Sequence, residues 1–366
     1  QLVPLIDIVH DRVNLEVFRG CIRGCRFCQA GYVYRPVREK SADAILDKSK
    51  TLVETSGHDE VSLTSLSTAD YREFRKLAEG LLEQFKDEKV NIALPSLRID
   101  AFSLDLMQKV QGVRKSSLTF APEAGTQRLR DVINKGITEE EILRGSSLAF
   151  EGGWDRVKLY FMVGLPTEKD EDVKGIAKLA SDIVDKFYEL PKEKRNRGVS
   201  VTVSSSCFVP KAFTPFQWSA QNTCDEFLRK QYLLKDSNER KQVKVNYHEP
   251  TVSSIEGILA RGDRKVAKLI VQAWENGAKF DGWTESFKYD AWLKALEQTG
   301  LSREFYANRE RSYDEILPWD HISIGVSKRF FIEEMEKAKN ETVTPNCRQD
   351  CSMCGAKVFG GGVCFE

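Results

Sequence analysis

The first half of the chain alternates short apolar segments with longer amphipathic ones. Between residue 13 and about residue 210, runs rich in β-branched and aromatic residues are separated by stretches of helical periodicity. This alternation is typical of parallel βα units. The predicted strands begin near residues 15, 61, 91, 117, 157 and 199. Because successive right-handed βα units curve a parallel sheet in one sense, we expect an α/β fold, a partial (β/α)6 TIM-like barrel.

The pattern changes after Trp218. Helical periodicity then dominates, with one short strand-like interruption at 243–248. The last segment holds four cysteines and has no apolar periodicity, so it cannot build a core of its own and would need a metal to organise it. We therefore divide the chain into a lead-in segment (1–12), a partial barrel (13–218), a C-terminal helical extension (219–343) and a Cys-rich metal-binding tail (344–366).

Charge and hydropathy exclude several classes of protein. Lys and Arg together number 55, as do Asp and Glu, and no long basic run predicts a nucleic-acid footprint. No stretch approaches the roughly 18 apolar residues of a membrane span, and no signal-peptide pattern opens the chain. We expect a cytoplasmic protein. The chain begins with Gln1 directly ahead of a strand-like segment, so we also expect a preceding segment.

Seven of the nine cysteines lie in two tight clusters. The first, CIRGCRFC, holds Cys21, Cys25 and Cys28 directly after the first predicted strand, and active sites of barrels lie at the carboxyl ends of strands. Three thiolates would hold a [4Fe–4S] cluster and leave one iron free to bind S-adenosylmethionine (SAM) and reduce its sulfonium. The three cysteines are thus the candidate catalytic residues, and Phe27 would pack against the adenine.

The alternative for this cluster is a zinc site. Structural zinc normally has four protein ligands, and only His10 is available nearby as a fourth. We therefore favour the iron–sulfur interpretation, which predicts a 5′-deoxyadenosyl radical as the product of homolytic SAM cleavage.

The sequence resembles the radical SAM superfamily, which shares this cysteine motif, the aromatic residue before its last cysteine, and the six-unit partial barrel. The resemblance extends over about residues 13–218. Four longer blocks, at 10–39, 119–130, 160–172 and 208–218, resemble an uncharacterised bacterial family of cobalamin-binding radical SAM proteins. Its members usually carry a cobalamin domain ahead of the barrel, so the resemblance implies cobalamin as a further cofactor.

The resemblance also implies where SAM binds. Glu123 and Gly125 match the position at which a carboxylate bonds the ribose, although Glu123 could instead cap the following helix. Ser65 and Ser67 occupy the place of the motif that binds the methionyl amine, although Ser67 could also cap a helix. Gly164 matches the glycine-containing segment under the adenine, where an ordinary turn glycine is equally suitable.

The second cysteine cluster satisfies the ligand count of two different metal sites. Cys347, Cys351, Cys354 and Cys364 could close a zinc site or hold a second iron–sulfur cluster. The sequence leaves both interpretations open. Either metal would organise the tail.

Three functions follow from these motifs. The favoured one is a radical SAM enzyme, a transferase that moves a methyl group with the help of cobalamin, reduced by flavodoxin or ferredoxin. The second is radical modification of RNA or a ribosomal component, such as methylthio transfer. The third is a non-catalytic iron–sulfur or zinc protein. None of the three involves a membrane, and the substrate is not specified by the sequence.

Overall fold

The computed structural model describes residues 3–88, 90–93, 118–195 and 198–360. It is an α/β structure with parallel sheets, which confirms the predicted fold class. A strand occurs at each of the six predicted places, although the end of the third lies outside the described residues. The strands of the two parallel sheets are β1 (Val13–Glu16), β4 (Glu60–Thr64), β5 (Asn91–Ala93), β6 (Leu118–Glu123), β7 (Arg156–Val163), β8 (Ser200–Cys207) and β9 (Val243–Tyr247).

The strands form two parallel sheets and a small antiparallel ribbon. One sheet has the order β1-β4-β5 and the other the order β6-β7-β8-β9, while β2 (Phe18–Arg19) pairs antiparallel with β3 (Arg38–Glu39). In the first sheet Val13 lies opposite Val61 and Leu15 opposite Leu63, and all four side chains are buried. This apolar register holds the first strand, and therefore the cysteines that follow it, against the rest of the sheet.

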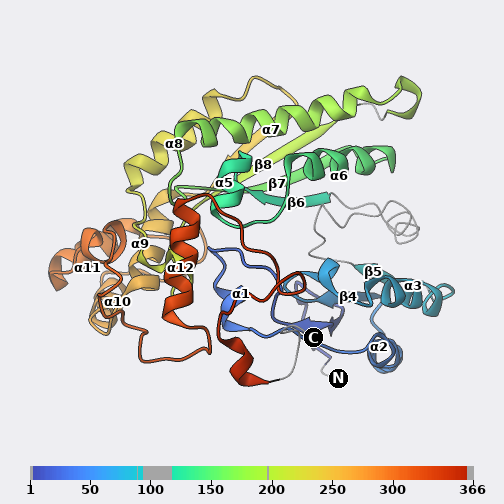
Figure 1. Cartoon of the computed structure of the whole chain (residues 1–366), viewed down its shortest axis with the longest axis horizontal. Coiled ribbons are helices and arrows are strands. Elements are labelled where there is room, and N and C mark those ends of the chain that lie inside the picture. Colours follow the sequence, from blue (N-terminus) through green and yellow to red (C-terminus); the bar gives the residue numbers. More distant parts are fainter. Residues whose placement is uncertain (1–2, 89, 94–117, 196–197, 361–366) are drawn as a thin grey trace.

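The helices that connect the strands cover the outer faces of the sheets (Figure 1). In the first half these are α2 (Ala42–Ser56) and α3 (Phe74–Gln84), and in the second α6 (Glu139–Glu151), α7 (Asp170–Glu189) and α8 (Cys224–Asp236). Apolar side chains of β6, β7 and β8 pack with those of the second group in one large core. Both sheets thus bury one face beneath helices, as parallel sheets require.

The strand-like interruption at 243–248 is part of the barrel sheet. In β9, Val243 and Val245 pair in parallel with Val201 and Val203 of β8. The sheet therefore continues one βα unit beyond Trp218, through α8, rather than ending there.

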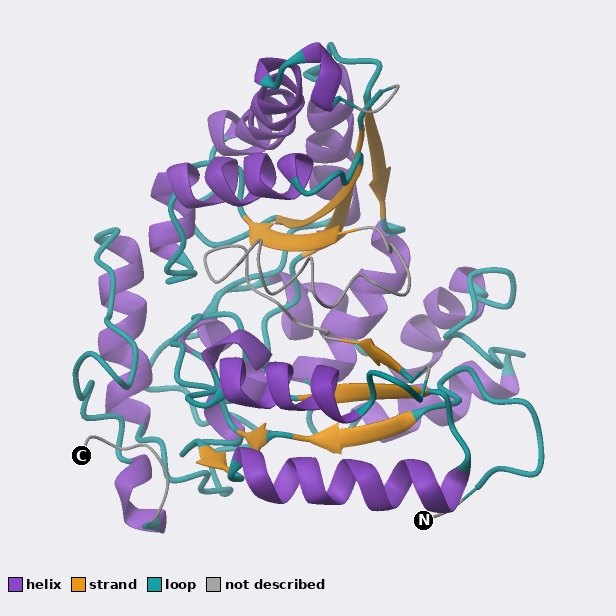
Figure 2. Cartoon of the chain, turned by 90° about the vertical axis from the view of Figure 1, so that its right-hand side faces the viewer, coloured by secondary structure: helices purple, strands orange, loops and turns teal. Residues whose placement is uncertain are grey.

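The remaining helices form two groups. In the first, α9 (Pro250–Arg261), α10 (Val266–Glu275) and α11 (Tyr289–Thr299) share a separate apolar core at one side of the molecule. In the second, α12 (Lys328–Lys339) returns to pack on the short helix α5 (Gln127–Val132) (Figure 1). Figure 2 shows the strands of the two parallel sheets in separate groups, with helices beside each. Among the described residues no helix has the length and apolar character needed to cross a membrane.

Gly125, which the resemblance places at the cofactor, is in close contact with α7. A Cβ atom on Gly125 would lie 2.3 Å from the carbonyl oxygen of Asp172 and 2.4 Å from the amide nitrogen of Ile176. Both are backbone atoms of a helix, which cannot move aside like the end of a side chain. The structure thus gives Gly125 a packing role.

We expect Gly125→Ala to lower the free energy of unfolding by at least about 2 kcal/mol, because the added methyl group would overpack this contact. Gly198→Ala is the matched control, since a Cβ atom on Gly198 would have no described atom within 4 Å. Urea denaturation of both variants measures the difference. Equal stability of the two would contradict the close approach.

Candidate metal centre and cofactor site

The first three cysteines lie together in one loop at the carboxyl end of the first strands. We call residues 21–28 the cluster loop; it follows β2 and ends at Cys28, the N-cap of α1 (Gln29–Val33). Burial raises the pKa of Cys21 to about 12, with Cys25 acting in the same direction. Burial also raises the pKa of Cys28, again reinforced by Cys25. The three thiols are therefore close enough to influence each other electrostatically.

This donor set fits the iron–sulfur cluster better than a single ion. Three cysteines match the protein ligands of a [4Fe–4S] cluster with one open iron, whereas structural zinc normally takes four ligands. His10, the proposed fourth ligand of a zinc site, precedes β1, whereas the cysteines lie beyond its other end. Arg12 contacts the His10 ring at 2.8 Å.

Arg26 connects the cluster loop by hydrogen bonds to α12, to the end of α5 and to the segment that follows α12. Its fully buried guanidinium donates to Glu334 of α12 at 3.1 Å and to the carbonyl oxygen of Val132 at 2.9 Å. It also donates to the carbonyl oxygen of Thr342 at 2.6 Å. Burial alone would raise the pKa of Glu334, but the hydrogen bond from Lys337 and the charge of Arg26 outweigh it and lower that pKa. The pair is thus ionised.

A second arginine of the loop binds the segment after β4. Arg23 makes a bidentate pair with Asp70, at 2.9 and 2.5 Å, and Ser67 donates to the same carboxylate at 2.7 Å. Ser67 therefore supports the cluster loop through Asp70. Neither Arg23, Arg26 nor Asp70 was singled out from the sequence. The only signal available was the presence of two arginines inside the cysteine motif.

Ser65 lies beside a cavity of about 380 Å³ at the carboxyl ends of β1 and β4. Glu16, Gly20 and Thr64 line the same cavity, so it borders the start of the cluster loop. Ser65 shares a 2.8 Å hydrogen bond with Thr68. Of the two serines, Ser65 is therefore the one next to open space.

Glu123 adopts a backbone conformation that is rare for its residue type. Its φ is +69°, at the end of β6 where the pairing with β7 is irregular. Its carboxylate pairs with Lys135 at 3.1 Å, and both groups act on the thiol of Cys28. The cap of α5 is Thr126, not Glu123, which removes the alternative role. A residue with an unusual backbone conformation whose carboxylate lies beside the cysteines is typical of a functional site.

Phe27 and Gly164 have packing partners in the structure. The ring of Phe27 packs against a buried cluster that includes Phe208, and Lys135 lies 5.9 Å from its centroid. Gly164 has a φ of +85°, and a Cβ there would lie 2.5 Å from the Phe227 ring. Gly164 thus serves the turn after β7 and its contact with α8.

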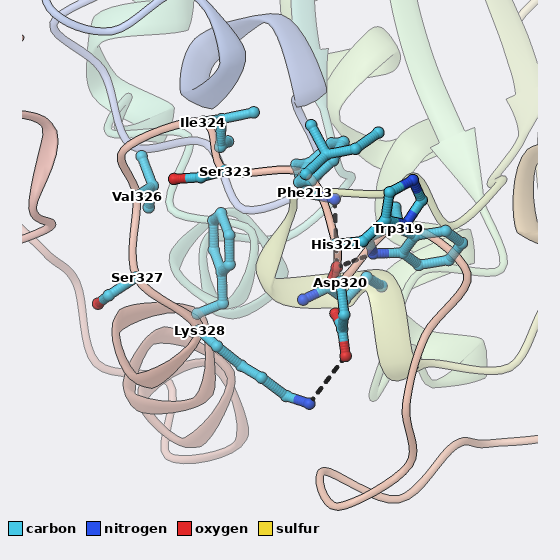
Figure 3. Close-up of a pocket in the computed structure, with 12 residues that line it drawn as sticks. Phe213, Trp319, Asp320, His321, Ser323, Ile324, Val326, Ser327 and Lys328 are labelled. Carbon is cyan, nitrogen blue, oxygen red and sulfur yellow. Dashed lines mark hydrogen bonds and ion pairs between the residues drawn. The ribbon is translucent and has the colours of Figure 1, made fainter.

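A further cavity, of about 390 Å³, lies between residues 319–328 and the loop after β8 (Figure 3). Trp319 donates to Gln217 across it at 2.7 Å, and Lys328 pairs with Asp320 at 3.2 Å. One of its lining residues, Phe331, packs edge-to-face on Tyr32 of α1 with ring centroids 5.2 Å apart. The side chain of Phe331 therefore connects this cavity with α1, the helix whose N-cap is Cys28.

Of the second cysteine cluster, Cys347, Cys351 and Cys354 lie in the described part of the chain, and Cys364 lies outside it. Cys354 is buried, Cys351 is exposed and Cys347 is intermediate. The backbone amide of Cys347 donates to the carbonyl oxygen of Ile22 at 3.0 Å. The tail therefore contacts the cluster loop directly.

Comparison with known proteins agrees with this geometry. Residues 15–180 match the Radical SAM superfamily. This stretch is therefore a radical SAM domain, and the radical SAM fold implies a [4Fe–4S] cluster and SAM as cofactors.

An uncharacterized protein of Methanocaldococcus jannaschii is 33% identical over 256 residues, which cover 70% of this chain and 53% of the relative. A putative methylthiotransferase of the same organism is 23% identical over 168 residues, 44% of this chain and 37% of the relative. This chain thus spans about half or less of the length of these relatives. Among solved structures, the radical SAM methyltransferase TsrM from Kitasatospora setae, with cobalamin and a [4Fe–4S] cluster bound, superposes with a TM-score of 0.41 and 15% identity, covering 53% of this chain and 34% of that one.

We expect Glu334→Gln to lower the free energy of unfolding by about 3 kcal/mol, because it leaves the Arg26 charge buried without its partner. The matched control is Glu333→Gln, at the neighbouring position. It removes only an exposed ion pair with Arg329 and should lower the free energy of unfolding by less than about 0.5 kcal/mol. Urea denaturation of the two variants under reducing conditions gives both values. Similar losses would contradict a special role of the buried pair.

The pH dependence provides a check on this prediction. Since the pKa of Glu334 is lowered in the folded protein, its stabilisation is complete above the ordinary value of 4.5 and is lost as the pH falls below it. The difference between the wild-type protein and Glu334→Gln should therefore shrink in acid.

Proposed function

We propose that this chain cleaves SAM reductively at a [4Fe–4S] cluster held by Cys21, Cys25 and Cys28. The observation that carries the proposal is the grouping of three partly buried thiols in one loop at the carboxyl ends of the strands of a radical SAM domain. Three protein ligands leave one iron open for the amino and carboxylate groups of SAM. The cluster, when bound and reduced, would supply the one electron that splits a carbon–sulfur bond of SAM into methionine and a 5′-deoxyadenosyl radical.

The residues around the loop would bind and orient SAM. Glu123, held by Lys135 next to Cys28, offers two acceptor oxygens for the ribose hydroxyls. The cavity that Ser65 and Gly20 line would accommodate the methionyl end. Arg23 and Arg26 keep the loop in one conformation through Asp70 and Glu334, so that the cofactor meets a preformed site.

We further propose that the radical is used for methyl transfer to an unactivated carbon with the help of cobalamin. Flavodoxin or ferredoxin would be the electron donor of the enzyme. Support comes from the blocks of sequence that resemble cobalamin-binding radical SAM proteins.

Methylthio transfer to RNA or a ribosomal component is the second candidate. The similarity to a putative methylthiotransferase over 168 residues favours it. The two reactions differ in what reaches the substrate, because methylthio transfer adds a sulfur atom and methyl transfer does not.

We expect the protein reconstituted anaerobically with iron and sulfide to form 5′-deoxyadenosine from SAM after addition of dithionite, and Cys28→Ala to form none. Chromatography of the quenched reaction measures the product. Cys224→Ala, which changes a thiol far along the chain, should keep the activity. A fully loaded cluster that binds SAM without cleaving it would favour a non-catalytic iron–sulfur protein.

We also expect Glu123→Gln to weaken SAM binding about tenfold, the effect of losing one charged hydrogen-bond partner. Equilibrium dialysis against the loaded, unreduced protein measures the affinity. Glu151→Gln, at the exposed end of α6, should bind SAM like the wild-type protein. Unchanged affinity in Glu123→Gln would remove this residue from the cofactor site.

A further inference from the structure

Several hydrogen bonds connect the tail (344–366) to the cluster loop. Besides the bond from Cys347 to Ile22, the amide of Thr344 donates to the side chain of Asn134 at 2.9 Å. Asn134 in turn donates to the carbonyl oxygen of Gly24 at 3.1 Å. Further along, the carbonyl oxygen of Cys354 accepts from the amide of Ser327 at the start of α12, at 3.0 Å. Cys347 and Cys354 are therefore held in fixed positions.

Arg35 lies in the space between the cluster loop and these two cysteines. Its side chain is buried, with an exposed fraction of only 5%. Its Nε donates to the carbonyl oxygen of Gly31 at 3.0 Å and its Nη2 to that of Arg23 at 3.1 Å. The guanidinium also lies 4.7 Å from the centroid of the Tyr32 ring.

The Arg35 charge lacks an anionic partner among the described carboxylates. Its Nη1 is buried and has no hydrogen-bond partner among the described groups. The acidic groups near the guanidinium are the phenol of Tyr32 and the thiols of Cys347 and Cys354, all of them neutral in the absence of a metal. A buried cation without a counter-charge is costly, and a neutral thiol cannot provide that charge. Two thiolates bound to a metal would provide the counter-charge.

We propose that the tail holds a thiolate-bound metal centre, with Cys347 and Cys354 as ligands and Arg35 as the buried counter-charge. The third ligand would be Cys351, which is exposed and lies between the other two cysteines in the sequence. Zinc and an iron–sulfur cluster share this thiolate chemistry, and both carry negative charge when bound by several cysteines. The centre does not depend on the cluster that we propose for the first three cysteines.

The test uses the full chain with Cys21, Cys25 and Cys28 replaced by Ala, so that all remaining metal belongs to the tail. Purified anaerobically, this variant should retain about one zinc, or about four irons with matching sulfide, per chain. Adding Cys354→Ser should abolish the metal, whereas adding Cys207→Ala, a buried thiol of β8, should not. Zinc and iron counts identify the centre. Retention of no more metal than the Cys354→Ser variant would overturn the proposal.

Arg35 is tested in the same background by the rate at which a chelator removes the metal. Arg35→Gln should lose it at least about tenfold faster, as expected for the loss of a charge-assisted hydrogen bond, and Arg35→Lys should be intermediate. Alkylation of Cys351 in the native protein, blocked until chelator is added, provides a readout independent of folding. Equal rates in Arg35→Gln and the background would overturn the counter-charge role.

Discussion

The buried guanidinium of Arg26 is the interaction on which the site depends. A fully buried charge must have its hydrogen bonds satisfied, and Arg26 obtains them from Glu334, from carbonyl oxygens at the end of α5, and from Thr342 and Thr344 at the start of the tail. These partners come from three separate parts of the chain. The cluster loop can therefore adopt its position only when α5, α12 and the tail are also in place.

Three arginines in and just after the cysteine motif extend this principle. Arg23 binds Asp70 beyond β4 and Arg26 binds Glu334 on α12. Arg35 donates to the carbonyl oxygens of Arg23 in the motif and of Gly31 in α1. Each fixes a different side of the same short loop. A loop held on several sides keeps its thiols in a constant arrangement, which lowers the reorganisation needed when a cofactor binds.

Glycines of the same region illustrate how packing and function are separated in space. Gly125 and Gly164 face helices α7 and α8, whereas Glu123, two residues before Gly125, faces the cysteines. The strand end thus presents a carboxylate to the site on one side and accepts a helix on the other. Resemblance alone could not distinguish these roles, because it assigns all three residues to the binding of the same cofactor.

The sequence by itself determined the parallel βα architecture, the places of six strands and the cysteine motif, because these are written in local periodicity and in spacings of three or four residues. Only the tertiary structure decided that β9 extends the sheet and that Ser67 acts through Asp70. It likewise decided that Arg26 pairs with Glu334, 308 residues away. Such contacts depend on burial and on the direction of side chains from distant elements, and no local pattern records them.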